Sequence, residues 1–406
     1  MIPYFMKKKV VIIGTGIGGL TAGYELLKKN NEVTFFEKEK QVGGLAAGFK
    51  MEGKMLDKSY RHIFKTDKEL IELIEELGLK NKLNWYKSST GLYWQGKIYP
   101  FLTAMDLLKF KPLNGLEKFR MGMVAMWLKY DKNWQKYENV LAYGWMKKMI
   151  GDKPYKVVWE PLLKGKFDDI YKKISMAWLW ARIHTRGNST NEQGEEVLGY
   201  LDGGFETLTD ALVKKIKSKG GKIKFEEIGQ PQELPLQKKF DLVIDTRPIK
   251  EIDYLGTVNI VFSSTQDLGK YYWNNINDLG SPFVALLQHT KLVGTEKYNG
   301  KNIYYLGTYV SQKSKYFKWS DQQIIDEWLN YLPNVFPSFD RKKISQINVF
   351  KFKNAQHVVV PGYKVPSYKV SDNYYRLNFA QIYPQDRGMN YAVNEAKKLV
   401  KEIIDF

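Results

Sequence analysis

The sequence predicts an α/β protein with two domains, and three observations support this prediction. A glycine-rich turn lies between an apolar run and a helix-like segment within residues 10–44. The chain has 406 residues, of which 44% are hydrophobic, so it can bury a core larger than one domain usually needs. A second loop-and-helix motif, YPQDRGMNYA, lies near the opposite end of the chain.

The glycine-rich turn predicts a βαβ unit. Residues 10–13 and 33–36 are apolar runs typical of buried strands, and residues 20–29 have the character of a helix. The turn carries the pattern G-x-G-x-x-G, with Gly14, Gly16 and Gly19 as its three glycines. Thr15 and Gly18 lie between them and are also expected to contact the ligand. Such glycines permit a sharp turn and leave space for a pyrophosphate at the helix N-terminus. We therefore expect a Rossmann-like dinucleotide-binding domain.

Two features after this unit indicate which dinucleotide binds. Glu37 lies 18 residues after Gly19, where its carboxylate can accept both hydroxyls of an adenosine ribose and would repel a 2′-phosphate. NADP is therefore disfavoured. The glycine pair Gly43-Gly44 follows. Nothing in a nicotinamide dehydrogenase requires residues without side chains at this point.

The segment as a whole resembles the FAD-binding superfamily of amine oxidases, protoporphyrinogen oxidases and phytoene desaturases. In flavin-bound members, such a glycine pair lies beside the ribityl–pyrophosphate arm. The resemblance implies FAD as the cofactor. It also implies a set of N-terminal cofactor-binding residues, namely Gly14, Thr15, Gly16, Gly18, Gly19, Glu37, Lys38, Gly43, Gly44 and Leu45.

Composition limits the remaining classes of function. The chain has no cysteine, which excludes disulfides, thiolate metal sites and a cysteinyl–flavin bond, so we expect noncovalent FAD, no metal and a cytoplasmic location. No run reaches the ~18 apolar residues of a membrane-spanning helix. The net charge of +19 indicates an anionic partner, although a general lysine bias would give the same value. No nucleic-acid-binding motif is recognisable, and we expect no nucleic acid partner.

Residues 61–64, Arg-His-Ile-Phe, resemble the His-rich segment beside the flavin of UDP-galactopyranose mutases. The resemblance implies that His62 faces the isoalloxazine ring, and a histidine satisfied within a turn is an equal alternative. Residues 66–69 have the sequence of a capping box and should begin an amphipathic helix that ends at Gly78.

The following region carries a conspicuous apolar stripe. A hairpin with a Gln95-Gly96 turn precedes it. The stripe has helical spacing and consists of Leu116, Phe119, Met123, Met126, Trp127 and Tyr130. Such a stripe usually packs in a core, but in membrane-associated members of the superfamily the corresponding insertion contacts the bilayer. The second interpretation predicts peripheral contact with the inner membrane face, and both remain open.

Residues 159–167 and 174–182 strongly resemble bacterial and archaeal protoporphyrinogen-oxidase-like oxidoreductases. Arg186 is a candidate to pair with a substrate carboxylate or phosphate, whereas we expect Arg182 to form a structural ion pair. His289 follows a predicted strand and is a candidate for the substrate cavity. Relatives tend to carry Glu-His-Thr here, where this chain has Gln-His-Thr. The pair Asn299-Gly300 predicts a hairpin turn.

The C-terminal motif resembles the second flavin motif of the same group. The resemblance implies that five residues bind FAD, namely Asp386, Arg387, Gly388, Met389 and Asn390. Backbone N–H groups of the last two would lie beside N1 and O2 of the flavin, where reduction places negative charge. The Gly-Asp pair that commonly holds the ribityl chain is absent, and Asp386 is the nearest acid in its place.

We therefore predict a discontinuous FAD-binding domain formed by residues 1–85, 200–250 and 351–406. Residues 86–199 and 251–350 would form an α+β substrate-binding domain with a mixed sheet and a helical insertion. The predicted function is that of an FAD-dependent oxidoreductase, which oxidises or desaturates an apolar or amphipathic small molecule (an isoprenoid, a tetrapyrrole or an amine) by hydride transfer to flavin.

The candidate catalytic residues are His62, Arg186 and His289. Two alternative functions remain open. One is a flavin-dependent UDP-sugar mutase, an isomerase like UDP-galactopyranose mutase, and the other is a flavin-binding protein without catalysis.

Overall fold

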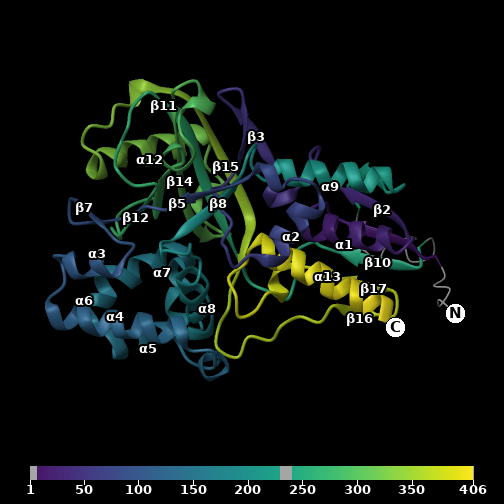
Figure 1. Cartoon of the computed structure of the whole chain (residues 1–406), viewed down its shortest axis with the longest axis horizontal. Coiled ribbons are helices and arrows are strands. Elements are labelled where there is room, and N and C mark those ends of the chain that lie inside the picture. Colours follow the sequence, from purple (N-terminus) through teal and green to yellow (C-terminus); the bar gives the residue numbers. More distant parts are fainter. Residues whose placement is uncertain (1–6, 229–239, 406) are drawn as a thin grey trace.

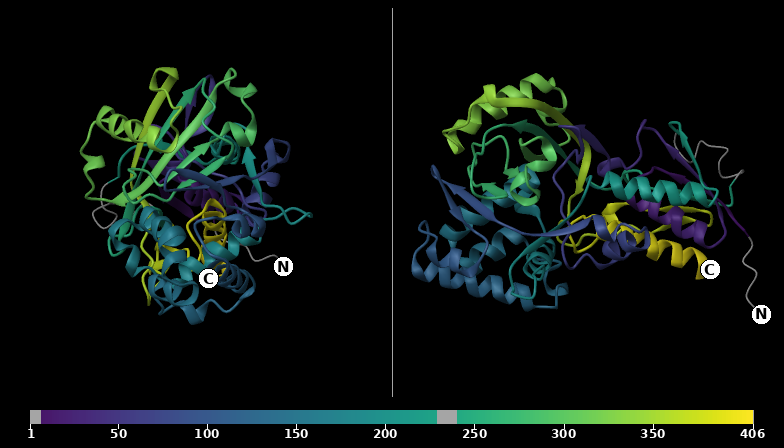
Figure 2. Two further views of the ribbon diagram at one scale, coloured as in Figure 1. Left: turned by 90° about the vertical axis from the view of Figure 1, so that its left-hand side faces the viewer. Right: turned by 45° about the horizontal axis from the view of Figure 1, so that its top comes forward.

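The computed structural model of the chain describes residues 7–228 and 240–405. The molecule is elongated, with two large sheets side by side along its long axis and a lobe of helices below one of them in the view of Figure 1. The right-hand view of Figure 2 shows the same separation from a second direction. Within the described ranges, no helix combines the length and the apolar character needed to cross a bilayer.

The first sheet has six strands in the order β16-β17-β10-β1-β2-β9. Neighbouring strands run parallel except for β16 and β17, which are antiparallel. The strands are β1 (Lys9–Ile13), β2 (Glu32–Glu37), β9 (Lys222–Phe225), β10 (Leu242–Asp245), β16 (Lys369–Ser371) and β17 (Tyr374–Arg376). They come from the start, the middle and the end of the chain. This arrangement confirms the predicted Rossmann-like fold.

Four helices form the core with this sheet. They are α1 (Ile17–Lys28), α2 (Lys68–Glu76), α9 (Glu206–Ser218) and α13 (Met389–Asp405). Helix α1 packs against both α9 and α13, and α2 packs on α13. Where α1 crosses β2, a Cβ at Gly23 would lie 2.1 Å from Cζ of Phe35, so glycine is required for this close approach.

The second sheet has seven strands in the order β15-β11-β14-β13-β12-β6-β7. It is antiparallel except for the pair β12 and β6, which makes it the mixed sheet that we predicted. The strands are β6 (Thr90–Trp94), β7 (Lys97–Pro100), β11 (Tyr254–Ser264), β12 (Trp273–Ile276), β13 (Ala285–Gln288), β14 (Asn302–Ser311) and β15 (Ile344–His357). Helix α12 (Asp321–Val335) packs against this sheet through the buried Trp328.

A helical lobe is inserted between β7 and β8 (Val197–Leu201). Its helices are α3 (Ala104–Lys109), α4 (Gly115–Tyr130), α5 (Ala142–Ile150), α6 (Asp152–Pro154), α7 (Glu160–Phe167) and α8 (Met176–Gly187). Helix α8 packs against α4 and α5, and the lobe has a hydrophobic core of its own. Strand β8 pairs with β5 (Leu83–Lys87), and β3 (Gly48–Met51) forms a hairpin with β4 (Lys54–Asp57).

Two local predictions are wrong. The capping box at residues 66–69 does not form, because α2 begins one residue later, with Asp67 instead of Thr66 at its N-cap and no side-chain cap. Asn299 and Gly300 have the positive φ angles of a tight turn. However, α11 (Thr290–Val293) lies in the connection from β13 to β14, so the turn does not join two strands directly.

The apolar stripe of α4 is not in the core. Leu116, Phe119, Met123, Met126, Trp127 and Tyr130 expose between 45% and 70% of their surface. The buried residues of α4 are Met121, Val124 and Leu128, which pack into the core of the helical lobe. The core-packing interpretation of the stripe is therefore wrong, because a different stripe of the same helix makes those contacts.

Two substitutions on α4 test this assignment. Leu128→Ala removes a fully buried side chain and should lower the free energy of unfolding by about 2–5 kcal/mol. Phe119→Ala removes a side chain that is 65% exposed and should change it by less than about 0.5 kcal/mol. Urea denaturation followed by circular dichroism measures both values. Equal destabilisation by the two substitutions would contradict the observed orientation of the helix.

Candidate functional site

A cavity of about 1440 Å³ has walls from both sheets. The first sheet contributes the glycine loop and the residues after β2, and the second contributes Tyr309 and residues 349–353. Helix α8 and the C-terminal motif complete the wall. The volume exceeds the ~300–1,000 Å³ of a usual ligand pocket, so the cavity has room for a dinucleotide and a second molecule.

The glycine loop opens one end of this cavity. Gly14 has a φ of +100°, and a Cβ there would lie 2.2 Å from Oγ1 of Thr246. At Gly16, a Cβ would meet no protein atom within 4 Å, because this position faces the open cavity. Gly16 also precedes α1, and no side chain caps the N-terminus of that helix. The first N–H groups of α1 are therefore left for an anionic ligand such as a diphosphate.

Glu37 lies at the end of β2 and also lines the cavity. Its carboxylate accepts hydrogen bonds from the Thr15 N–H at 2.9 Å, the Thr15 hydroxyl at 2.6 Å and the Glu39 N–H at 2.9 Å. A carboxylate offers about four lone-pair sites. One site therefore remains for a ribose hydroxyl, fewer than the two hydroxyl contacts that the sequence suggested.

The other end of the cavity carries a cluster of charges, which we call the cationic cluster: Lys166, Arg182, Arg387, Asp386 and Tyr309. The Asp386 carboxylate lies 3.2 Å from Nζ of Lys166 and 3.0 Å from Nη1 of Arg182. It also accepts a hydrogen bond from the indole of Trp178 at 3.3 Å. Burial raises the pKa of Asp386, but Lys166, Arg182 and Arg387 outweigh that effect and lower it to about 2. Arg182 thus forms the ion pair expected from the sequence.

Tyr309 is held by the same cations. Its hydroxyl accepts a hydrogen bond from Nη2 of Arg387 at 2.9 Å, and Nζ of Lys166 lies 4.2 Å from the centre of its ring. Burial raises the pKa of Tyr309, but the positive charges of Arg387 and Lys166 prevail and lower it to about 8. Tyr309 is therefore a phenol that can lose its proton close to neutral pH.

The structure brings His62 and Arg186 to the cavity wall. His62 packs edge-on against Phe64 and Trp273, and its Nδ1 has no hydrogen-bond partner among the described residues. Burial, with further effects from Arg186 and Arg182, lowers the pKa of His62 to about 3. The imidazole is therefore neutral at physiological pH. Arg186 forms an ion pair with Glu196 at 3.4 Å.

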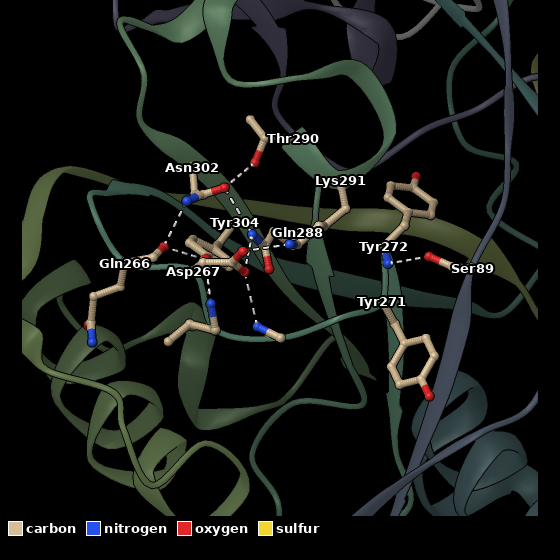
Figure 3. Close-up of polar contacts among 12 residues, drawn as sticks. Ser89, Gln266, Asp267, Tyr271, Tyr272, Gln288, Thr290, Lys291, Asn302 and Tyr304 are labelled. Atoms are coloured by element: carbon tan, nitrogen blue, oxygen red, sulfur yellow. Dashed lines mark hydrogen bonds and ion pairs between the residues drawn. The ribbon is translucent and has the colours of Figure 1, made fainter.

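The expectation that His289 lines the cavity is wrong. His289 does not belong to the cavity wall and is buried among tyrosines, with Nε2 at 3.1 Å from the Tyr298 hydroxyl. Its neighbour Gln288 donates hydrogen bonds to Asp267 at 3.0 Å and to Asn302 at 2.9 Å (Figure 3). The Gln-His-Thr segment therefore fastens the end of β13 to a loop of the second sheet, away from the cavity.

All the predicted cofactor-binding residues line the cavity except Asn390. The Asn390 side chain turns toward α2, where it accepts from the Leu70 N–H at 2.9 Å and donates to Glu69 at 2.8 Å. Its side chain thus joins α13 to α2, while the adjacent Met389 remains at the cavity. Asp386 also differs from the expectation of a ribityl ligand, because the protein cations already occupy its carboxylate.

Sequence reasoning missed Lys166 and Tyr309. Lys166 lies in a segment that we singled out for its resemblance, but no local pattern marks it, since its partner Asp386 is 220 residues away. Tyr309 is one of 27 tyrosines and lies within a strand. Among the residues that the structure describes, no group of histidines and carboxylates could hold a metal ion.

Comparison with known proteins places these features in a family. The chain is 24% identical over 243 residues to mitochondrial protoporphyrinogen oxidase of Nicotiana tabacum, covering 52% of this chain and 48% of that protein. It is 25% identical over 229 residues to coproporphyrinogen III oxidase of Staphylococcus aureus, covering 53% and 46%. It thus spans about half the length of these relatives. The structure of a reduced UDP-galactopyranose mutase has the same fold, with a TM-score of 0.75, 14% identity and coverage of 98% and 96%.

The model of one family matches the chain from the glycine loop to the end of the region after β9. It describes the flavin containing amine oxidoreductases and matches residues 17–228, which is just over half of the chain. Flavin is the cofactor of this family. This agrees with the large cavity and with the uncapped N-terminus of α1 beside it. The chain therefore belongs to the family of flavin containing amine oxidoreductases.

Proposed function

We propose that the chain is an FAD-dependent oxidoreductase that oxidises or desaturates an apolar or amphipathic small molecule carrying an anionic group. One observation carries the proposal: a single cavity extends from the glycine loop to the cationic cluster. The first end suits the diphosphate of a dinucleotide, and the second suits a carboxylate or phosphate on a second molecule.

The residues at the cavity fit FAD. Gly14, Gly16 and the N-terminus of α1 would hold its diphosphate, Glu37 its ribose, and the segment from Arg387 to Met389 its ring. The bound flavin would supply the hydride-accepting ring for the reaction. We infer noncovalent binding because the chain has no cysteine to form a thioether.

The charges of the cavity disfavour one of the three candidate substrate classes, the amines. Lys166, Arg182 and Arg387 outnumber the single carboxylate of Asp386, so a protonated amine would be repelled there. A tetrapyrrole carboxylate or a prenyl phosphate would pair with the cations of the cluster, and the two tetrapyrrole-oxidising relatives support the first of these.

One residue of the cavity is suited to accept the substrate proton, and others are suited to position the substrate. Tyr309, as a phenolate, would accept a proton from the substrate, and the Arg387 guanidinium stabilises that phenolate. His62 lines the cavity as a neutral imidazole, so its ring would help to position the substrate. Arg186 would contribute positive charge beside His62, although Glu196 offsets part of it.

The proposal includes a cytoplasmic location and peripheral contact with the inner membrane face. The cysteine-free sequence supports the first, and the exposed stripe of α4 supports the second. A lipid-like substrate would be consistent with such contact.

A UDP-sugar mutase remains the second candidate, because the cationic cluster would also pair with a nucleoside diphosphate. Conversion of UDP-galactopyranose without net change in the flavin redox state would establish it. A flavin-binding protein without catalysis is the third candidate, and it requires that lipids, porphyrins and amines all fail to bleach the flavin spectrum.

The first prediction concerns the cofactor. The purified protein should be yellow with flavin absorbance, and denaturation should release the FAD into solution. Gly16→Val should abolish FAD binding, because the new side chain would extend into the cavity without touching the protein. Gly144→Val, on the exposed surface of α5, is the matched control and should retain the flavin. A colourless protein that takes up no added FAD would contradict the proposal.

The second prediction concerns the anionic group. Coproporphyrin III should perturb the flavin absorbance at lower concentration than its tetramethyl ester does. In protein saturated with FAD, Arg387→Met should weaken coproporphyrin binding by about tenfold or more, the effect of one charged hydrogen bond. Arg341→Met removes an exposed arginine paired with Asp326 and should have no effect. Equal binding of the acid and its ester would exclude an anion-binding role for the cluster.

The third prediction concerns pH. Because the pKa of Tyr309 is lowered to about 8, its phenolate is populated above that pH and lost below it. The rate of flavin reduction by substrate in a single turnover should therefore rise with pH through about 8. Tyr309→Phe should reduce the rate and remove this dependence. An unchanged pH profile in Tyr309→Phe would show that another group accepts the proton.

A further inference from the structure

A basic recess of about 700 Å³ lies at the end of the molecule opposite to α1 and β2 (Figure 1). Three segments that are far apart in the sequence meet there: the hairpin of β6 and β7, the connection between α3 and α4, and α6 with the helical turn after it. Among the described residues, the recess shares no lining residue with the large cavity. Its volume is typical of a small-molecule site, so it is a candidate for a second ligand.

Positive charge gathers in the recess. Four lysines line it, namely Lys97, Lys111, Lys153 and Lys156. Of these, only Lys153 has a carboxylate partner among the described residues, at 3.9 Å from Glu117. Asp152, the one acid in the described lining, already pairs with Lys147 at 3.0 Å. Ammonium groups that gather without carboxylates repel one another, and an anion relieves that repulsion. The recess therefore favours a ligand that carries several negative charges.

Two half-buried aromatic rings form another part of the wall, Trp94 at the end of β6 and Tyr99 in β7. Tyr99 packs edge-on against Phe110, with the ring centres 5.2 Å apart. Trp94 has no aromatic ring partner within the described parts of the chain, so its indole can stack with a planar group of a ligand. Aromatic rings beside cations are suited to a molecule that carries both a planar ring and phosphates.

A π-helical turn forms a third part of the wall. Helix α6 continues through this turn, Tyr155–Trp159, directly into α7. The carbonyls of Val157 and Val158 accept hydrogen bonds from Nδ2 of the buried Asn277 at 2.9 and 3.1 Å. Such turns are rare and are frequent at functional sites. Lys156 and Val157 thus face the recess from a backbone segment that a buried side chain holds in place.

We propose that the recess binds a nucleoside diphosphate or triphosphate, with its base against Trp94 and its phosphates among the four lysines. Lysines supply point charges for several phosphate oxygens, and the indole beside them supplies a stacking surface for the base. Inorganic phosphate would leave the ring without a partner, and an uncharged aromatic compound would leave the lysines without one. A nucleotide satisfies both parts of the wall.

Helix α7 connects the recess to the cationic cluster. It begins where the π-helical turn ends, and near its other end it carries Lys166 to the large cavity. A nucleotide that contacts Lys156 therefore acts on the same continuous helical segment that positions Lys166. The proposal itself needs neither bound flavin nor turnover, so it can fail while the proposed function holds, and the reverse is also true.

Equilibrium dialysis of ADP against the full chain saturated with FAD tests the proposal, because FAD then occupies the glycine loop. ADP should bind saturably and about tenfold more tightly than pyrophosphate, since only ADP has a base to stack. Binding should weaken at high salt. ADP should bind equally well to Gly16→Val, whose glycine loop is blocked, which separates the recess from the flavin site.

Lys111→Gln combined with Lys156→Gln removes two charges from the recess. This variant should bind ADP about tenfold or more weakly, the effect of losing charged hydrogen bonds. Lys214→Gln with Lys313→Gln, two exposed lysines elsewhere, is the matched control and should bind ADP as the unchanged protein does. Circular dichroism should show the same folded state in both variants.

Trp94→Leu tests the stacking partner. It should lower the affinity for ADP to that for pyrophosphate and leave pyrophosphate binding unchanged, a combination that a misfolded protein would not show. The proposal is overturned if the FAD-saturated protein binds no ADP, if Gly16→Val loses ADP binding, or if the Lys111/Lys156 variant binds ADP as tightly as its control. It is also overturned if pyrophosphate binds the unchanged protein as tightly as ADP does, or if Trp94→Leu keeps the preference for ADP.

Discussion

The buried carboxylate of Asp386 is the contact on which the geometry of the cavity depends. Only 10% of its side chain is exposed, and a buried charge without partners would be strongly destabilising. Lys166 from α7 and Arg182 from α8 supply those partners. The carboxylate therefore fixes the C-terminal motif to two helices of the helical lobe. Arg387, the next residue, then reaches β14 through the Tyr309 hydroxyl, so one ionic centre joins three parts of the chain.

The fold explains why this centre and the glycine loop line the same cavity. In a parallel sheet with the Rossmann topology, ligands bind at the carboxyl ends of the strands. Ile13 at the end of β1, Glu37 at the end of β2 and Thr246 after β10 all line the cavity. The second sheet and α8 cover the same edge from the other side. A molecule that spans the cavity would thus meet uncapped helical N–H groups at one end and side-chain cations at the other.

The parts of the site that could be predicted from the sequence are those whose residues are close together in the chain. The pattern from Gly14 to Gly19 can be read from sequence because the turn, the helix and the strands are contiguous. The cationic cluster has no such pattern, since Lys166 and Asp386 meet only after the whole fold forms. His289 shows the opposite error: its sequence context indicated a cavity position, but the connection after β13 turns its ring toward Tyr298. Sequence adjacency to a strand end therefore identifies candidates without fixing where their side chains point.

The orientation of α4 could not be predicted for a different reason, which is that its sequence contains two apolar stripes. The helix has two apolar stripes, one containing Leu116 and Phe119 and the other containing Met121 and Leu128. Periodicity reveals that each stripe lies on one side of a helix, but it does not reveal which side meets the rest of the protein. The choice is made by packing against α8, which takes the narrower stripe and leaves the one with larger side chains outside. Packing within the helical lobe uses only one apolar side of α4, so the second remains available for the peripheral contact that we propose.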